Sequence, residues 1–378
     1  DGHRRGPFEM DVKSSLEESR GDRRYVSSDT VTGSYTTLPD ATPRRVTGRM
    51  RWMDQVRGAA ILLVVVFHAE TIMSRFIPGG HDASPVALLL VLDLFAPYRM
   101  PTLMFLSGML LSRSLSKSTH AYFGGKLRGI AWPYVLWTVV FLAVSDDIGL
   151  FRLLQMPIVS PTYLWYLQFL FYYYVIAWVI TRSPLRWVPA WFPLLVAGAG
   201  ALGPDQYRIS RFFYLFFFFW LGHLVANNRY GLRSFIEKRA PTVGIASLIL
   251  VVVVAVAATQ IQVQYRLAFI IGPIALCVLV VGWVPLFGAW RPLVFVGQHS
   301  IVFYATHFSV IWICDWWLSQ LTTSPWILWL AGSGAALIIG ALMAHLRARG
   351  ALAWAFEFPR LPFGAAGHGP GILRRRTR

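Results

Sequence analysis

Hydrophobic runs long enough to cross a lipid bilayer recur along this chain, and they decide what kind of fold it can adopt. A hydrocarbon core of about 30 Å takes roughly 20 helical residues, and fewer where the ends are snorkelled or kinked. The 378 residues are 56% hydrophobic and only 14% charged, which is far more apolar than a soluble domain. The sequence therefore predicts an all-α, polytopic integral membrane protein.

About ten transmembrane helices are expected from these runs. The fifth and sixth are short and rich in Pro or Phe. The predicted spans are residues 57–75, 86–112, 129–146, 162–180, 187–203, 211–226, 243–258, 266–288, 294–318 and 325–346.

The positions of the cations give an independent test of this topology, because cytoplasmic loops are enriched in Lys and Arg. If the N-terminus is inside, the inside segments hold 29 of the 35 Lys and Arg residues, and the outside segments hold five. The remaining cation, Arg99, falls within the second predicted helix. Both termini are therefore predicted to be cytoplasmic.

The net charge of +17 could suggest a nucleic-acid-binding protein. Such proteins concentrate their charge on one face together with aromatic platforms, whereas here the charge follows the sidedness of the loops. Orientation signals and contacts with anionic membrane lipid explain the surplus, so we expect no nucleic-acid partner.

One helical membrane domain with two tails is the expected organisation. Residues 1–50 are polar and of mixed charge, which predicts a disordered cytoplasmic tail; residues 51–346 are the membrane domain, and 347–378 a cytoplasmic tail. Cys277 and Cys314 lie in apolar runs and are interpreted as packing residues. No His, Asp or Glu cluster has the spacing of a metal site, so none is predicted.

Polar residues follow one side of the first predicted helix, in the segment RWMDQVRGAAILLVVVFH (51–68). Each helical residue advances about 100°, so the step from Arg57 to His68 brings both within about 20° of one line. Asp54 falls about 40° from that line, whereas Glu70 points about 160° away from His68 and is left out of the site. The helical rise separates Arg57 from His68 by roughly 16 Å, so one lies near a membrane surface and the other well inside. Polar side chains at that depth are expensive and usually functional.

The spacing of Arg57 and His68 resembles the signature of the membrane acyltransferase 3 family, as does the flanking sequence DQVRGAAILLVVVFH. Other segments resemble family segments in the same order, and the likeness extends over most of residues 50 to 346. These segments are PYRMPTLMFLSGMLL (97–111), FGGKLRGIAWPYVLW (123–137), LWYLQFLF (164–171) and VGQHSIVFYATHF (296–308).

The resemblance implies a multi-pass protein of the bacterial plasma membrane that moves an acyl group, expected to be acetyl, from cytoplasmic acyl-CoA to a hydroxyl. The acceptor would be an envelope glycan, a lipid or a small natural product. Acyl transfer to a hydroxyl needs a base that works near pH 7, and His is the side chain suited to that task. His68 is placed for it, although a packed histidine bonded to a neighbouring helix is the alternative.

Three cations are candidates for holding the acyl-CoA donor at the cytoplasmic face, because its phosphates cannot enter lipid. They are Arg57, Lys126 and Arg128. The paired arginines of the family correspond here to Lys126 and Gly129, with Arg128 beside them, and both cations could instead be positive-inside anchors. Asp54, one turn before Arg57, is grouped with the catalytic residues because its ion pair would hold Arg57.

Four further residues are candidates for substrate binding. Arg99 lies between two prolines in an apolar run, where it could polarise the acyl carbonyl or contact the acceptor; a pair with Asp93 or snorkelling is the alternative. Tyr304 and His307 share a helical face and could line the same cavity, or simply bond between helices. Trp165 could stack on a sugar or macrocycle, or belong to an aromatic belt.

Two other functions remain open from the sequence. A transporter or flippase for a lipid-linked or anionic solute would also place Arg, His and Asp inside the membrane. Such folds often contain related halves, and no such duplication is visible here. A purely structural scaffold would leave the Arg57 and His68 stripe unexplained.

Overall fold

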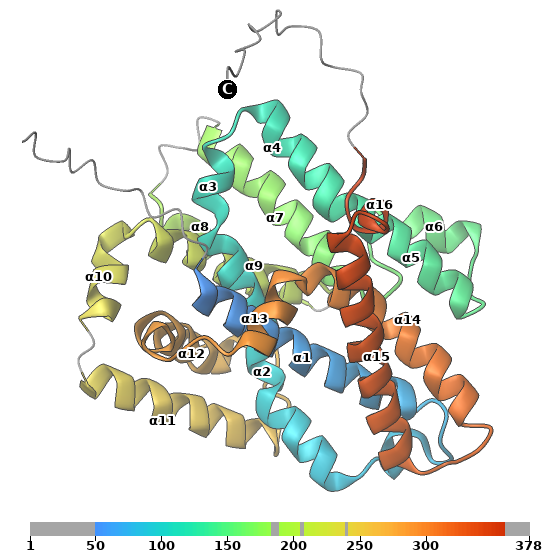
Figure 1. Ribbon diagram of the computed structural model, residues 1–378. Helices are drawn as coiled ribbons and strands as arrows, with labels where there is room; N and C mark the ends of the chain where they lie inside the picture. The colour runs from blue at the N-terminus through green and yellow to red at the C-terminus, as the bar shows by residue number, and fades with distance from the viewer. Residues whose placement is uncertain (1–49, 183–188, 205–207, 239–240, 360–378) are drawn as a thin grey trace, which may run out of the picture. The chain divides into compact units, whose positions relative to one another are not determined.

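The computed structural model describes residues 50–182, 189–204, 208–238 and 241–359, and these are predominantly helical (Figure 1). Within these ranges there is no β-strand. The described residues all belong to a single compact unit. The expected N-terminal tail lies outside them, except for Met50.

Sixteen α-helices, joined in places by single-turn helices, make up the described residues. In chain order they are α1 (Arg51–Met73), α2 (Val86–Met109), α3 (Leu111–Leu115), α4 (Thr119–Lys126), α5 (Trp132–Val144), α6 (Leu150–Gln155), α7 (Trp165–Arg182), α8 (Phe192–Ala201), α9 (Ile209–Ala226), α10 (Leu232–Glu237), α11 (Pro241–Ala258), α12 (Ile271–Gly282), α13 (Arg291–Gln298), α14 (Ser300–Leu318), α15 (Pro325–Ala348) and α16 (Ala353–Phe356). The single-turn helices are η1 (Gly80–Ala83), η5 (Arg229–Gly231), η6 (Leu267–Phe269) and η7 (Val284–Leu286), together with the π-helix η2 (Leu127–Ala131) between α4 and α5.

Eight helical segments are long and apolar enough to cross a membrane by length and composition. This confirms a polytopic helical membrane protein, but two of the ten expected spans are not among the eight. Helix α7 has 18 residues but contains Gln168 and the polar tyrosines 172–174. Helix α8 has ten residues and rises about 15 Å, half of the hydrocarbon core.

Two other expected spans have different boundaries in the structure. The third begins at Thr119 instead of residue 129, because the Ser118 hydroxyl caps α4 by accepting from the Ala121 backbone N–H and the π-helix continues into α5. The ninth is divided at His299, whose φ of −107° and ψ of 22° separate α13 from α14.

Helix α1 lies among α2, α13, α14 and α15 and makes extensive contact with all four (Figure 1). Its crossing with α13 is a backbone contact. A Cβ added to Gly58 would lie 2.0 Å from the carbonyl oxygen of Leu293, and one added to Gly297 would lie 1.8 Å from that of Asp54. Small residues at such crossings let membrane helices approach closely. This crossing fixes the N-terminal half of α1, where Arg57 lies, against α13.

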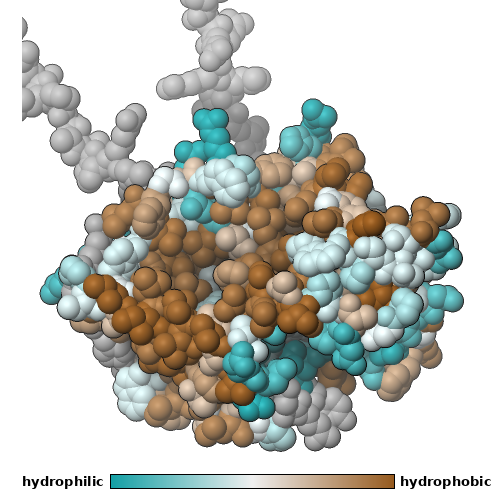
Figure 2. Space-filling view, turned by 90° about the horizontal axis from the view of Figure 1, so that it is seen from below, coloured by the Kyte–Doolittle hydropathy of each residue, from teal (hydrophilic) through white to brown (hydrophobic). Residues whose placement is uncertain are grey.

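Helix α11 is the most lipid-like surface among the eight membrane-length segments. Only 17% of its 18 residues are buried, and its exposed residues include Leu248, Val252 and Val256. Figure 2 looks onto the side of the molecule where α11 lies and shows broad hydrophobic patches. An apolar surface of this kind fits contact with lipid chains.

The chain beyond α15 packs on the helices, which differs from the expected start of a tail at residue 347. Trp132 Nε1 donates to the carbonyl oxygen of Trp354 (2.7 Å), and Trp137 Nε1 donates to that of Ala355 (3.0 Å). Phe356 is fully buried and stacks on Trp137. Residues up to 359 are therefore part of the folded unit, while the Arg-rich end lies outside the described residues.

Candidate active site

Two histidines from different helices meet inside the protein. His68 is in the last third of α1, and its Nδ1 atom lies 3.0 Å from Nε2 of His307 on α14. His307 is fully buried, whereas His68 is partly accessible. The sequence offered His307 as a residue that could line the same cavity, and the structure brings its ring into contact with that of His68.

Hydrogen bonds to the backbone fix the tautomers of this pair. Nδ1 of His307 lies 2.9 Å from the carbonyl oxygen of Tyr304 and 3.1 Å from that of Phe303, so Nδ1 must carry the hydrogen. Nε2 of a neutral His307 is then an acceptor, and Nδ1–H of His68 is the donor to it. The lone pair of His68 is consequently on Nε2, the nitrogen opposite the bond. Such an imidazole is oriented to take a proton at Nε2.

Aromatic rings enclose the histidine pair. Phe308 meets the His68 ring edge-on with a centroid distance of 5.2 Å and stacks on Tyr163 at 4.5 Å. The Tyr163 ring is 5.2 Å from that of His307, and its hydroxyl donates to the carbonyl oxygen of Ala305. These contacts limit the movement of both imidazoles and exclude water from one side. The sequence analysis had not singled out Phe308, although its position next to His307 was the available signal.

A cavity of about 180 Å³, here called the small cavity, is lined by Arg57 but by neither His68 nor His307. Arg57 and Ile61 of α1 line it together with Tyr304 of α14, whose ring is 5.7 Å from that of His307. The other lining residues are Leu103, Ser107, Leu110, Ile130, Tyr166, Leu167, Leu170, Tyr174, Ser300 and Ile301. Of the predicted polar stripe of α1, only Arg57 lines the small cavity, and Tyr304 is its link to the histidine pair.

Asp54 holds the Arg57 side chain at the end of the small cavity. Its Oδ1 atom is 3.8 Å from Nη1 of Arg57, and its Oδ2 atom accepts from Nε2 of Gln298 at 3.5 Å. Asp54 itself is 3% exposed. The carboxylate thus contacts Arg57 and α13, and it does not line the cavity.

Lys126 and Arg128 differ in their surroundings. Nζ of Lys126 donates to Ser114 Oγ (3.1 Å) and lies 3.3 Å from the ring centroid of Tyr174, which lines the small cavity. Arg128 instead pairs with Glu357 (2.6 Å) and donates from Nε to the carbonyl oxygen of Phe358 (2.9 Å). Lys126 is therefore next to the small cavity, while Arg128 is held by the C-terminal segment and does not line it.

Arg99 lies inside α2, which continues as a helix through both neighbouring prolines. Its side chain is 4% exposed, and Cζ lies 3.5 Å from the ring centroid of Phe67, the residue before His68. Among the described residues no carboxylate comes within 4.0 Å of its guanidinium, so the pair with Asp93 does not form. Arg99 lines a second cavity on another side of α1.

Trp165 lies away from both cavities. Its ring contacts those of Phe169 and Tyr265, with centroid distances of 5.4 and 6.4 Å, and the Arg211 guanidinium lies 5.6 Å from it. The structure therefore does not bring Trp165 together with His68. Its contacts are those of a packing residue at the start of α7.

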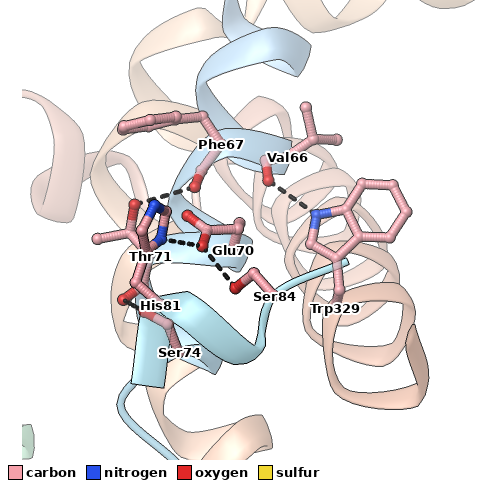
Figure 3. A network of polar contacts seen from close by, with 8 residues as sticks. All are labelled: Val66, Phe67, Glu70, Thr71, Ser74, His81, Ser84 and Trp329. Carbon is pink, nitrogen blue, oxygen red and sulfur yellow. Dashed lines mark hydrogen bonds and ion pairs between the residues drawn. The ribbon is translucent and has the colours of Figure 1, made fainter. Parts of the chain in front are cut away.

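Glu70 is part of a separate polar network at the end of α1 (Figure 3). Its Oε1 atom accepts from His81 Nδ1 (2.7 Å) and from the Ser84 hydroxyl (2.9 Å). Beside it, Trp329 Nε1 donates to the carbonyl oxygen of Val66 (2.9 Å). These bonds tie the loop after α1 and helix α15 to the turns that surround His68.

No group of three or more His, Cys, Asp or Glu side chains among the described residues could hold a metal ion. Both cysteines are free thiols.

A comparison with protein families gives one finding on the function. A family model described as an acyltransferase domain matches residues 50–345, which includes both cavities and the histidine pair. Neither a curated protein nor a solved structure matches the chain.

Proposed function

The chain belongs to the membrane acyltransferase 3 family, and on that basis we propose that it transfers an acyl group from acyl-CoA to a hydroxyl, with His68 as the general base. The observation that carries the proposal is the hydrogen bond between His68 and His307, which leaves Nε2 of His68 as a proton acceptor. General-base catalysis of this kind contributes roughly 10²- to 10⁴-fold to a rate.

In the proposed reaction, Nε2 of His68 takes the proton of the acceptor hydroxyl as that oxygen attacks the thioester carbonyl. The tetrahedral intermediate collapses, the C–S bond breaks, and the thiolate of CoA takes the proton from the His68 imidazolium. An ester and free CoA–SH result, and the imidazole is neutral again. A covalent acyl-histidine, in which Nε2 attacks the thioester first, has the same overall balance.

The small cavity is the proposed site of the donor. Arg57, at one end, would bind a phosphate of CoA, and the neutral pantetheine arm would extend past Ser107 towards Tyr304. Lys126 is the second cation next to this cavity, through its contact with Tyr174. Because Arg128 is engaged by Glu357, we assign it to positioning the C-terminal segment and no longer to the donor.

The distribution of cations supports a cytoplasmic location for both termini and for Arg57. Donor access would then be cytoplasmic, while His68 lies deeper in the bilayer. We retain ten crossings as part of this proposal, with α7 and α8 added to the eight membrane-length segments; eight and ten both return the chain to the same side. The acyl group is proposed to be acetyl, and the membrane that of a bacterial cell.

Full-length protein in lipid nanodiscs would test the proposal with acetyl-CoA and a panel of hydroxyl acceptors, measured by release of free thiol. We expect acceptor-dependent release that falls by at least about 10²-fold in His68→Ala. His345→Ala is the matched control, because that histidine is exposed on α15, donates to the carbonyl oxygen of Ala341 in its own helix and contacts the Phe295 ring rather than the histidine pair. Equal rates in His68→Ala and His345→Ala would remove the assignment of the base.

A further inference from the structure

A second cavity, here called the large cavity, lies between α1, α2, α11 and α12 and has a volume of about 520 Å³. This is within the range of sites that bind small molecules. Most of its lining is aliphatic, and the described charged residue in the lining is Arg99. The large cavity is thus a hydrophobic chamber with one cation.

The large cavity opens sideways, onto the surface that faces lipid. Phe95, Val252 and Val256 line it and are also 43%, 51% and 54% exposed on the outside of the molecule. Figure 2 shows broad hydrophobic patches on this side of the protein, next to polar regions. A molecule dissolved in the bilayer could therefore reach the cavity without passing through water.

Arg99 marks the buried end of the cavity. A guanidinium at this depth is costly unless it is paired, yet no carboxylate of the described residues forms an ion pair with it. Its described contact is with the face of Phe67. The guanidinium accordingly keeps N–H donors for an oxygen atom of a ligand.

We propose that the large cavity binds a membrane-dissolved, single-chain amphiphile whose carboxylate or carbonyl oxygen is held by Arg99, with its hydrocarbon part between α2 and α11. Shape and polarity both favour this occupant over a sugar, since a sugar would need polar partners along the whole wall. A charged oxygen is matched by the buried cation, and a hydrocarbon chain by the aliphatic lining.

We further propose that the bound amphiphile is the acyl acceptor, and this part of the inference rests on the proposed function. Phe67 separates Arg99 from the histidine pair: its ring is under the guanidinium and its centroid is 5.3 Å from that of His68. An amphiphile held at Arg99 would bring a hydroxyl near its polar end towards Nε2 of His68 by displacing this one ring.

Photolabelling of the full-length protein in nanodiscs tests the binding site without any acyl donor. The probe is a C16 fatty acid with a photoreactive group on its chain, and the comparison probe is the alcohol of the same length. We expect the fatty acid to label α2 and α11, and Ala255→Trp, which fills the cavity, to reduce this labelling about tenfold. Ile249→Trp is the matched control, because Ile249 is on α11 and 56% exposed but does not line the cavity.

Arg99→Gln should reduce labelling by the fatty acid about tenfold while leaving labelling by the alcohol unchanged. Ala255→Trp keeps Arg99, so the two variants test the cavity and the cation separately, and size-exclusion profiles report whether each is folded. The proposal would be overturned if Ala255→Trp left labelling by the fatty acid unchanged. It would also be overturned if a photoreactive phospholipid labelled the protein as strongly as the fatty acid and lost labelling in the same variants. His68→Ala should label normally while lacking acyl transfer, so failure of the binding site and failure of the enzymatic assignment are distinguishable.

Discussion

His307 accepts a hydrogen bond of 3.0 Å from His68, and it is itself held by two carbonyl oxygens of its own helix. In the proposed mechanism the second histidine is a positioning residue for the first. It would set which nitrogen of His68 acts as the base, in the way that a third group orients the base in other catalytic constellations.

Substitution of His307 should therefore lower turnover without weakening donor binding. We expect His307→Ala to reduce kcat by about 10- to 10³-fold with little change in the KM for acyl-CoA, because the small cavity and Arg57 are untouched. His307→Gln keeps a side-chain oxygen that can accept from His68 Nδ1–H, so it should recover part of the loss. A wild-type kcat in His307→Ala, or no difference between Ala and Gln, would contradict the positioning role.

Arg57 and Arg128 should respond differently to removal of their charge. Loss of one charge-assisted bond to a CoA phosphate corresponds to about 1.5–3 kcal/mol, so Arg57→Ala should raise the KM for acyl-CoA by about 10- to 100-fold. Arg128→Ala, which breaks only the bonds to Glu357 and Phe358, should leave that KM within about twofold. Isotopic assays at varied donor concentration measure both, and the reverse order would move the donor site to Arg128.

The crossing of α1 and α13 should tolerate no side chain at its centre. Gly297→Ala places a Cβ against the Asp54 carbonyl oxygen, so the helices must separate; overpacking of this kind costs about 1–3 kcal/mol. The expected result is a lower thermal midpoint in detergent. Gly334→Ala on α15 is the matched control, since nothing lies within 4 Å of the added Cβ. Equal midpoints for the two variants would show that the crossing is looser than described.

The buried carboxylate of Glu70 should stabilise the end of α1. Glu70→Ala leaves the Ser84 hydroxyl without its acceptor, and an unsatisfied buried group costs about 1–3 kcal/mol. The neighbouring Asp82 is exposed, so Asp82→Ala should change stability by less than about 0.5 kcal/mol. Thermal unfolding of both variants measures the difference in stability. An unchanged unfolding midpoint in Glu70→Ala would exclude a structural role for this network.

The segment after α15 should depend on one side chain. Phe356 is completely buried against Trp137, and removal of a buried Phe costs about 3–5 kcal/mol. We expect Phe356→Ala to release the segment and to make it accessible to limited proteolysis. Trp354→Ala is the control, because that side chain is 51% exposed while its backbone carbonyl still accepts from Trp132. Equal cleavage of both variants would mean that the segment is held by backbone bonds alone.

Periodicity within one helix was the part of this architecture that the sequence revealed best. Side-chain directions in a helix follow from residue number, so the sequence could place Asp54, Arg57 and His68 near one line of α1, and the structure shows Arg57 at the small cavity. The all-helical membrane fold followed from hydrophobic length in the same way. The count of about ten spans stays a prediction, since α8, within the fifth expected span, has only ten residues.

Contacts between helices could not be predicted from the sequence, because no local pattern indicates which helices are neighbours. His68 and His307 are 239 residues apart, and Arg128 and Glu357 are 229 apart. A lone basic residue near a helix end looks the same in sequence whether it binds a phosphate or a carboxylate of its own chain. The pairing of Arg128 and the meeting of the two histidines therefore required the tertiary structure.

Helices α1 and α2 each line both cavities, with different residues facing each one. Arg57 and Ile61 face the small cavity, whereas Val56, Ala59 and Leu63 face the large one. The large cavity is completed by α11 and α12, and neither of these helices reaches the small one. With the acceptor in the large cavity and the donor in the small one, as proposed, substitutions on α11 and α12 would alter which acceptor fits and leave the lining of the donor cavity unchanged.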